Sequence, residues 1–208
     1  MRVFRLLRIL STIGRHGLDE FIVGRGMTLV RLPFRVAFFW ADRSRPRAVR
    51  LREALQELGP IFVKFGQLLS IRPDLIPADI VEELSKLQDS VPPFPAEQVV
   101  ATLDRAYAKP HAEVFRNFNL TPVASASVAQ VHFAELPDGR EVAVKILRPG
   151  IGETIDKDTH LLYAIAGLIE RLHPLSDLLR AREVIGEFDK IIRDELDLLR
   201  EASSMSTV

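Results

Sequence analysis

The 208-residue chain has room for one medium domain, or for one domain with an extension. Its apolar fraction of 47% and charged fraction of 27% are typical of a globular protein with a sizeable core. It contains no cysteine, which excludes a disulfide framework and cysteine-ligated zinc sites. Its histidines do not have the spacing of metal ligands, so no metal-binding residue is predicted.

The formal net charge of zero hides an uneven distribution along the chain. Residues 1–52 contain 12 arginines, no lysine and 3 acids, a balance of +9, whereas residues 53–208 have a balance of −9. Two interpretations stay open: a solvated helical surface, or an anionic partner such as a lipid surface or nucleic acid. Aromatic and basic residues are not interleaved, so we do not expect nucleic acid to be the partner.

The first predicted element is an amphipathic helix over residues 1–14. Leu6, Leu7 and Leu10 belong to a roughly helical apolar pattern, with arginines mostly between the apolar positions. Such a helix can lie in a membrane interface or pack on the rest of the domain, and the pattern does not separate the two. No segment is apolar over the roughly 20 residues that a membrane-spanning helix needs. No small-residue cleavage site follows the basic start, so a secretory signal is not predicted.

Most of the chain before residue 110 is predicted to be helical. A break is expected at Gly59-Pro60, because proline suits the first turn of a new helix. Further breaks are expected at the charged turn 41–47 and at the stiff linker 91–95. The expected helices are residues 18–40, 48–69, 77–87 and 96–106.

From residue 115 the sequence changes to short apolar runs rich in β-branched residues. Two such runs, 130–136 and 141–147, flank Pro137-Asp138-Gly139, which is typical of a hairpin turn. The helical pattern returns over 151–172 and about 182–204. Helices, then a three-stranded meander, then helices predict an α+β fold.

Two neighbouring segments carry residues suited to nucleotide binding. In the second strand of the hairpin, Val142 and Val144 are expected on one side, and Ala143 and Lys145 on the other. A kinase lobe holds nucleotide phosphates with a lysine that ends such a strand after a small-residue loop. The loop at 124–132 is rich in alanine and serine, which let backbone N–H groups approach phosphate oxygens. Taken singly, the two segments could also be a surface lysine and a ligand-free turn.

Two predicted helices carry residues that their apolar pattern does not explain. Lys64, Gly66 and Gln67 interrupt an apolar helix without an evident packing reason, and such local inconsistency often marks function. In the last helix, Asp197 and Glu201 are four residues apart and are expected to share one face. Glu201 could orient a lobe lysine; the alternative for a single helix glutamate is solvent exposure.

Together these segments resemble the UbiB family of atypical protein-kinase-like proteins, which support ubiquinone biosynthesis in bacteria and mitochondria. The resemblance covers essentially the whole chain. Its four ordered matches are the K-x-G-Q signature at 64–67, the alanine-rich loop at 124–127, Lys145 in V-A-V-K-I-L-R-P-G, and the E-x-D motif of Glu195 and Asp197.

The resemblance implies a gate that is specific to the family. In relatives the K-x-G-Q segment folds over the groove where a protein substrate would lie, which is thought to suppress protein phosphorylation and favour ATPase activity. Lys64, Gln67, Glu195 and Asp197 would form this gate here. Lys64 would pair with Glu195 or with Asp197.

The resemblance also implies ATP and Mg²⁺ as cofactors. Lys145 would contact the α- and β-phosphates, and Glu201 would orient Lys145. The alanine-rich loop would cover the nucleotide, through Ala124, Ser125, Ala126, Ser127 and Val128.

Several parts of the family's pattern are not in this sequence. The H-x-D-x-H-P-G-N-like catalytic loop, the D-x-G motif and the C-terminal membrane-spanning segments of bacterial members are absent. We therefore expect a gene fragment, a truncated chain or half of a split protein, with metal ligands outside it and no turnover alone. The expected domains are a helical extension over 1–110 and a kinase-like N-lobe over 111–208, with the C-lobe absent.

The implied function is ATP binding in support of ubiquinone biosynthesis, peripherally at the cytoplasmic face of the bacterial inner membrane. The implied partners are membrane lipids or quinone-pathway intermediates, and other proteins of ubiquinone biosynthesis. The alternative is a non-catalytic membrane- or lipid-binding scaffold with a vestigial kinase-like lobe. That scaffold would bind liposomes without responding to nucleotide.

Overall fold

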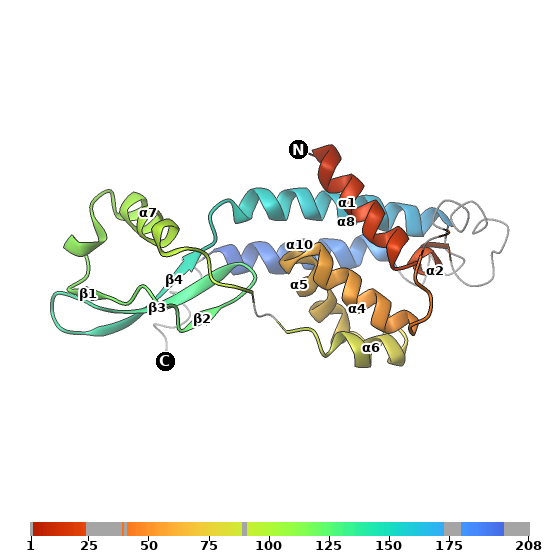
Figure 1. Ribbon diagram of the computed structural model, residues 1–208, viewed down its shortest axis with the longest axis horizontal. Coiled ribbons are helices and arrows are strands. Elements are labelled where there is room, and N and C mark those ends of the chain that lie inside the picture. Colours follow the sequence, from red (N-terminus) through yellow and green to blue (C-terminus); the bar gives the residue numbers. More distant parts are fainter. Residues whose placement is uncertain (1, 24–38, 40, 89–90, 173–179, 198–208) are drawn as a thin grey trace. The chain divides into compact units, whose positions relative to one another are not determined.

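The computed structural model describes residues 2–23, 39, 41–88, 91–172 and 180–197 (Figure 1). Across these residues, helices are combined with a four-stranded antiparallel sheet, which confirms the predicted α+β class. By packing, the chain divides into a helical unit, residues 1–88 with 155–208, and a sheet unit, residues 89–154. The boundaries between these units, after residues 88 and 154, differ from the domain boundary expected at residue 110. That domain division stays a prediction.

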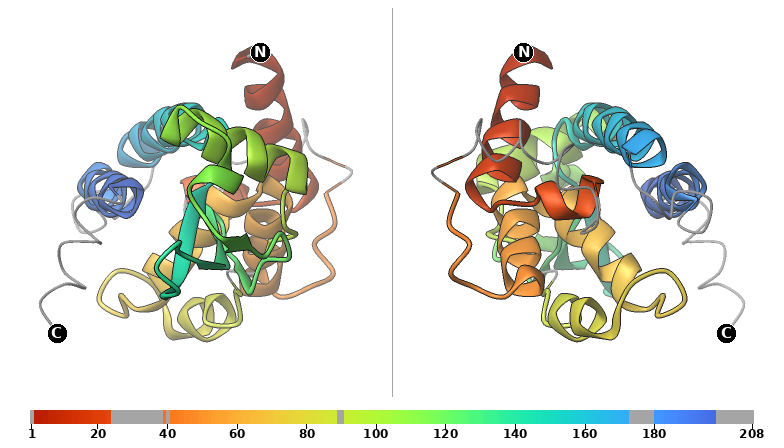
Figure 2. Two further views of the ribbon diagram at one scale, coloured as in Figure 1. Left: turned by 90° about the vertical axis from the view of Figure 1, so that its left-hand side faces the viewer. Right: turned by 90° about the vertical axis from the view of Figure 1, so that its right-hand side faces the viewer.

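The helical unit is built from segments at both ends of the chain. Its largest fully buried side chains include Phe62 of one segment and Phe188 of the other. Helices α8 and α10 lie side by side (Figure 2), where Arg193 of α10 donates to Asp156 of α8 at 2.8 Å. Its helices are α1 (Arg2–Arg15), α2 (Asp19–Val23), α4 (Arg47–Leu58), α5 (Pro60–Ser70), α6 (Ala78–Leu84), most of α8 (Ile151–Leu172) and α10 (Ala181–Leu196).

Helix boundaries follow the predicted breaks in part. The break at Gly59-Pro60 is confirmed, because Gly59 has φ 109°, a value that L side chains rarely adopt, and Pro60 opens α5. Of the helix expected over 18–40, only α2 lies within the described residues. The last helix was expected to continue to about residue 204, but α10 ends at Leu196 and residues 198–208 lie outside the described part.

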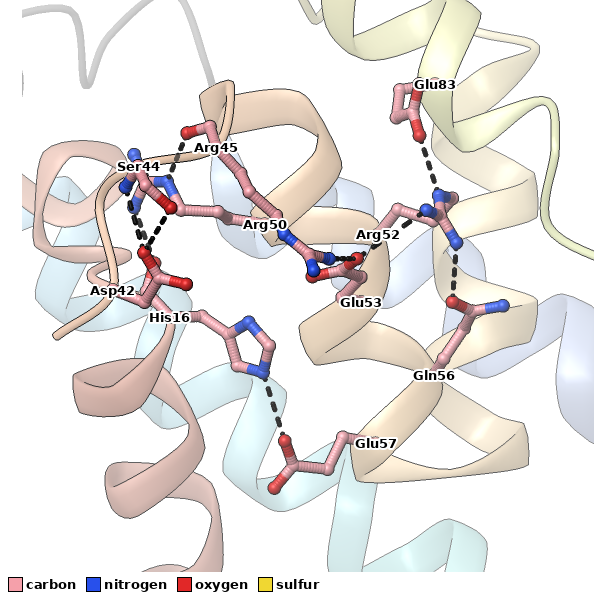
Figure 3. A network of polar contacts seen from close by, with 10 residues as sticks. All are labelled: His16, Asp42, Ser44, Arg45, Arg50, Arg52, Glu53, Gln56, Glu57 and Glu83. Carbon is pink, nitrogen blue, oxygen red and sulfur yellow. Dashed lines mark hydrogen bonds and ion pairs between the residues drawn. The ribbon is translucent and has the colours of Figure 1, made fainter.

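Arginines near the N-terminus are engaged inside the helical unit. Arg50 is almost fully buried, and its guanidinium donates to the backbone oxygens of His16 and Gly17 and pairs with Glu20. His16 also contacts Glu57 (Figure 3), as does Arg15 at 3.0 Å. Further pairs are Arg43 with Asp19, Arg45 with Glu53, Arg47 with Asp79, and Arg52 with Glu83.

These pairs bring arginines of the basic first part of the sequence into contact with acids, several of which lie after residue 52. Hydrogen bonds from Lys86 and Arg52 hold the pKa of the Glu83 carboxyl below its ordinary value. Apart from Arg8, which donates to a backbone oxygen, each arginine of residues 1–52 whose side chain is described contacts a carboxylate. The described arginines of the start are therefore largely neutralised within the unit, and by themselves they give no argument for an anionic partner.

The sheet unit is organised around β3 (Ala129–Glu135). It pairs along one side with β4 (Glu141–Leu147), and on its other side with two short strands, β1 (Asn117–Phe118) and β2 (Ala124–Ser125). The predicted hairpin turn is confirmed, because Gly139 closes it with φ 88° and its N–H donates to the Leu136 oxygen at 2.9 Å. The expected three-stranded meander is a four-stranded sheet, since β1 and β2 share one edge of β3.

One face of this sheet forms the core of the unit. The strands contribute Ala134 and Ile146, which pack with Val99 and Leu103 of α7 (Ala96–Tyr107). The same face buries two polar side chains. They are Gln130, whose Oε1 accepts from the N–H of Phe94 at 3.1 Å, and His132, whose Nδ1 contacts the backbone oxygen of Asn119 at 2.8 Å. His132 is 0% exposed and is therefore a hydrogen-bonded core histidine.

Candidate functional site

Lys145 lies on the sheet face opposite the core of its unit. Val142 and Val144 pack against the core, as the alternation of the strand predicts. Lys145 is half-buried and pairs across the ladder with Val131, one step from the exposed pair of Ala143 and Phe133. This face therefore carries Lys145 and apolar side chains, of which Phe133 is 57% exposed, and ends in the acidic pair of Glu135 and Glu141 at the hairpin.

The alanine-rich segment is more compact than the loop expected over 124–132. Ala124 and Ser125 form strand β2 and pair with β3, so only residues 126–128 remain as a turn. The turn closes tightly, since the Ala126 N–H donates to the Ala129 oxygen at 2.8 Å. Ser127 and Val128 are 0% and 1% exposed. The sequence pattern, read as an open loop, had not indicated this burial.

A shallow hollow of about 460 Å³ lies beside this turn. Its lining includes Ala124, Ser125 and the prolines 92, 93 and 122, and is mostly apolar. Lys145 is not part of the lining. The hollow therefore gives no argument for where nucleotide phosphates would bind.

The K-x-G-Q segment contacts α10 in the helical unit through its lysine. Nζ of Lys64 lies 3.0 Å from Oε2 of Glu195, and both side chains are about one quarter exposed. The neighbouring Phe65 packs edge-on against Phe188 of α10, with ring centroids 5.3 Å apart. Of the two acids proposed to pair with Lys64, the structure therefore shows the contact with Glu195.

Gly66 and Gln67 have packing roles that the sequence did not reveal. A Cβ built on Gly66 would lie 2.5 Å from Cδ1 of Leu87 and 2.8 Å from Cδ1 of Leu55, so the absent side chain lets these leucines close over α5. The Gln67 amide donates to the Leu87 backbone oxygen at 3.2 Å. Both residues thus hold Leu87, which follows the end of α6, against α5. The assumption that this helix lacked a packing reason for its glycine and glutamine was wrong.

The E-x-D acids have different backbone settings. Glu195 lies within α10, whereas Asp197 caps it with φ −81° and ψ 79°, outside the helical region. Asp197 is therefore not the helical residue that the shared face with Glu201 required, and Glu201 lies outside the described residues. The proposed pairing of Lys145 with Glu201 remains a prediction. Lys145 belongs to the sheet unit, and Lys64 and Glu195 to the helical unit.

A family comparison decides which class of protein this is. Residues 86–208, more than half of the chain, match the family described as "ABC1 atypical kinase-like domain".

The chain belongs to the ABC1 atypical kinase-like family.

The match to this ABC1 family starts just before the sheet unit and covers Lys145, the alanine-rich turn and the E-x-D acids. Among solved structures, the chain is similar to one described as the complex of Rv3197 with erythromycin from Mycobacterium tuberculosis. The two are 38% identical, with a TM-score of 0.38 over 64% of this chain and 35% of that one. This chain therefore spans about a third of the solved chain.

Two other kinds of site are absent from the described part of this ABC1 chain. Within it, no helix combines the length and apolar character needed to cross a bilayer. The same residues hold no group of three histidines or acids arranged for a metal ion.

One residue to which the sequence motifs gave no role, Arg148, makes several hydrogen bonds to the alanine-rich turn.

Proposed function

We propose that this chain is the nucleotide-binding part of a UbiB-like atypical kinase or ATPase, which binds ATP and supports ubiquinone biosynthesis at a membrane. The UbiB family belongs to the ABC1 group that the chain matches. The observation that carries the proposal is the position of Lys145. On its sheet face Lys145 lies next to the apolar Val131, Phe133 and Ala143, and the acidic pair Glu135 and Glu141 lies at the hairpin end of the same face. The strand β3 of this face begins directly after the tight turn of small residues.

Each part of this face would serve a different part of ATP. The apolar side chains would contact the base, and the ammonium group of Lys145 would contact the α- and β-phosphates. Glu201 would orient that ammonium group. Mg²⁺, when bound, supplies charge that neutralises the phosphates. We propose that its ligands come from the second lobe of a kinase, outside this sequence.

The K-x-G-Q segment would act as the gate of this protein. Lys64 already reaches Glu195 at 3.0 Å, which supports a gate formed by the K-x-G-Q and E-x-D motifs. Because both side chains are partly exposed, this ion pair contributes about 1 kcal/mol or less to stability. The ion pair would serve mainly to set the position of the helix that carries the K-x-G-Q segment. Gln67 and Asp197 would be the other members of the gate.

Replacing Lys145 with alanine should weaken the binding of Mg-ATP by at least about tenfold, since hydrogen bonds to charged groups contribute about 1.5–3 kcal/mol. Titration calorimetry on the chain, and on the chain joined to the second lobe of a relative, measures this. Lys109→Ala is the control, because Lys109 is an exposed lysine of the same unit. Equal affinity of the two variants, or an unmodified protein that binds no nucleotide in either form, would reject the ATP site.

A second function, binding to a lipid surface, is favoured by one feature of α1. Arg5, Arg8 and Arg15 of α1 donate hydrogen bonds to other helices of the unit, whereas Leu6, Leu7 and Leu10 are 41%, 55% and 45% exposed. This is the reverse of the expected helix with arginines toward lipid headgroups. Apolar contact, and not charge, would then drive any membrane association through α1.

Changing Leu6, Leu7 and Leu10 together to serine should abolish flotation with liposomes if α1 inserts its leucines into the bilayer. Ile71→Ser is the matched control, because Ile71 is 72% exposed elsewhere in the same unit. Liposomes with and without anionic lipid separate apolar insertion from charge attraction, and we expect little difference between them. Unchanged flotation of the triple variant would exclude α1 as the lipid contact.

A further inference from the structure

Arg148, directly after β4, joins the alanine-rich turn to the linker that precedes α7. Its Nε donates to the Ala126 oxygen at 3.1 Å. Its Nη2 donates to the Ser125 hydroxyl at 3.0 Å and to the Pro92 oxygen at 2.9 Å. Its guanidinium carbon also lies 5.5 Å from the ring centroid of Phe94.

The backbone of Arg148 adds a further contact to the same turn. Its N–H donates to the Val128 oxygen at 2.9 Å. Two carbonyl groups of the turn, those of Ala126 and Val128, therefore accept hydrogen bonds from this one residue. Linker and turn also meet directly, where the Val91 N–H lies 3.4 Å from the Ser125 oxygen. All of these residues belong to the sheet unit.

The chemistry of this position requires arginine. A guanidinium group presents several N–H donors in one rigid plane, and the same plane can lie over an aromatic ring. A lysine could keep the charge and one or two of the hydrogen bonds, but could not reach Ala126, Ser125 and Pro92 in the same fixed geometry. An apolar side chain of similar length would lose all three.

We propose that Arg148 is a positioning residue for nucleotide binding, which fixes the alanine-rich turn against the proline linker before the nucleotide arrives. This inference rests on the proposed ATP site and names the residue that organises it. A turn that is already fixed loses less conformational entropy on binding, so the affinity is higher. Without Arg148, the turn would have to be ordered by the nucleotide itself.

The test compares four variants of the full chain with the unmodified protein. Arg148→Met removes the side-chain donors, Arg148→Lys keeps the charge, and Ser125→Ala removes a single acceptor. Arg140→Met is the matched control, because Arg140 is an exposed arginine at the hairpin turn that contacts Asp138. Two quantities are measured on each protein: amide hydrogen exchange of residues 122–131 without nucleotide, and the dissociation constant for Mg-ATP.

We expect Arg148→Met to accelerate exchange in residues 122–131 only, and to weaken Mg-ATP binding by about five- to tenfold. Arg148→Lys should recover part of both losses, and Ser125→Ala should show a smaller loss in the same direction. Arg140→Met should match the unmodified protein. Because Ser125→Ala removes one hydrogen bond only, it tests the inference even if Arg148→Met fails to fold.

Three results would overturn the inference. The first is an Arg148→Met protein with unchanged exchange in the turn and unchanged affinity. In the second, exchange rises over the whole sheet unit and binding falls in proportion to the unfolded fraction, so that Arg148 only supports the fold. In the third, the unmodified protein binds no nucleotide, and the proposed function fails as well. Exchange in the turn distinguishes that case, because it reports the hold of Arg148 on the turn without any ligand.

Discussion

Replacing Arg5 with methionine should lower the free energy of unfolding by about 3–5 kcal/mol, the usual cost of leaving one partner of a buried ion pair alone. Asp158 of α8 is 1% exposed. Both of its oxygens accept hydrogen bonds from Arg5 of α1, at 2.8 Å and 2.6 Å. The same guanidinium donates to the Leu58 oxygen at 2.9 Å and lies over the Phe62 ring. Urea unfolding followed by circular dichroism measures the loss.

Two further proteins separate this pair from the general effect of removing an arginine. Arg8→Met should cost less than about 1 kcal/mol, since Arg8 is exposed and, among the described residues, donates to the Glu57 backbone oxygen alone. The double variant Arg5→Met with Asp158→Leu should recover most of the stability, because replacing both members of a buried pair by apolar groups is often neutral. If Arg5→Met unfolded at the same urea concentration as Arg8→Met, the pair would not hold α1 on α8.

Gly66→Ala is expected to lower the free energy of unfolding by about 2 kcal/mol, within the range for overpacking a core. The new methyl group would fall within 3 Å of side-chain carbons of Leu55 and Leu87. Both leucines are buried, at 6% and 5% exposure, so neither can move away without disturbing its own contacts. This loss exceeds the gain of up to about 1 kcal/mol that alanine brings to a helix.

Gly152→Ala isolates that helix gain from the steric effect. Gly152 also lies in a helix, α8, but a Cβ there would meet nothing within 4 Å. We expect this variant to unfold at the same or a slightly higher denaturant concentration than the unmodified protein. Should both alanine variants be stabilised equally, Gly66 would not mark a close approach between α5 and its neighbours.

Local patterns predicted the elements whose causes are local. The hairpin turn at residues 137–139, the break at Gly59 and the two faces of β4 depend on neighbouring residues, and the structure confirms all three. The K-x-G-Q and E-x-D motifs also located a real contact, since Lys64 and Glu195 meet across 131 positions of sequence. Residue spacing could not have predicted that contact. The resemblance to a family did so.

The features that sequence reasoning missed all depend on packing between distant segments. The need for glycine at position 66 comes from the close approach of Leu87. The direction in which Arg5 points is set by Asp158, which lies 153 positions away in the sequence. An apolar pattern alone could not show that Arg5 of α1 would face Asp158 while Leu6, Leu7 and Leu10 stay exposed. The contacts of Arg148 were missed because its three acceptors come from two segments, residues 125–126 and Pro92, and none is recognisable by residue type.

The division of the chain also affects the order in which its parts can fold during synthesis. Residues 89–154 form one continuous stretch that makes its own sheet and core, so this unit can fold as soon as it leaves the ribosome. The helical unit is completed only later, because Arg5, Phe65 and Lys64 of residues 1–88 contact Asp158, Phe188 and Glu195 near the far end of the sequence. Contacts of such long sequence separation slow folding. During synthesis, the surfaces of α1 and α5 that pack on α8 and α10 therefore stay uncovered for longer than the surfaces that pack within residues 1–88.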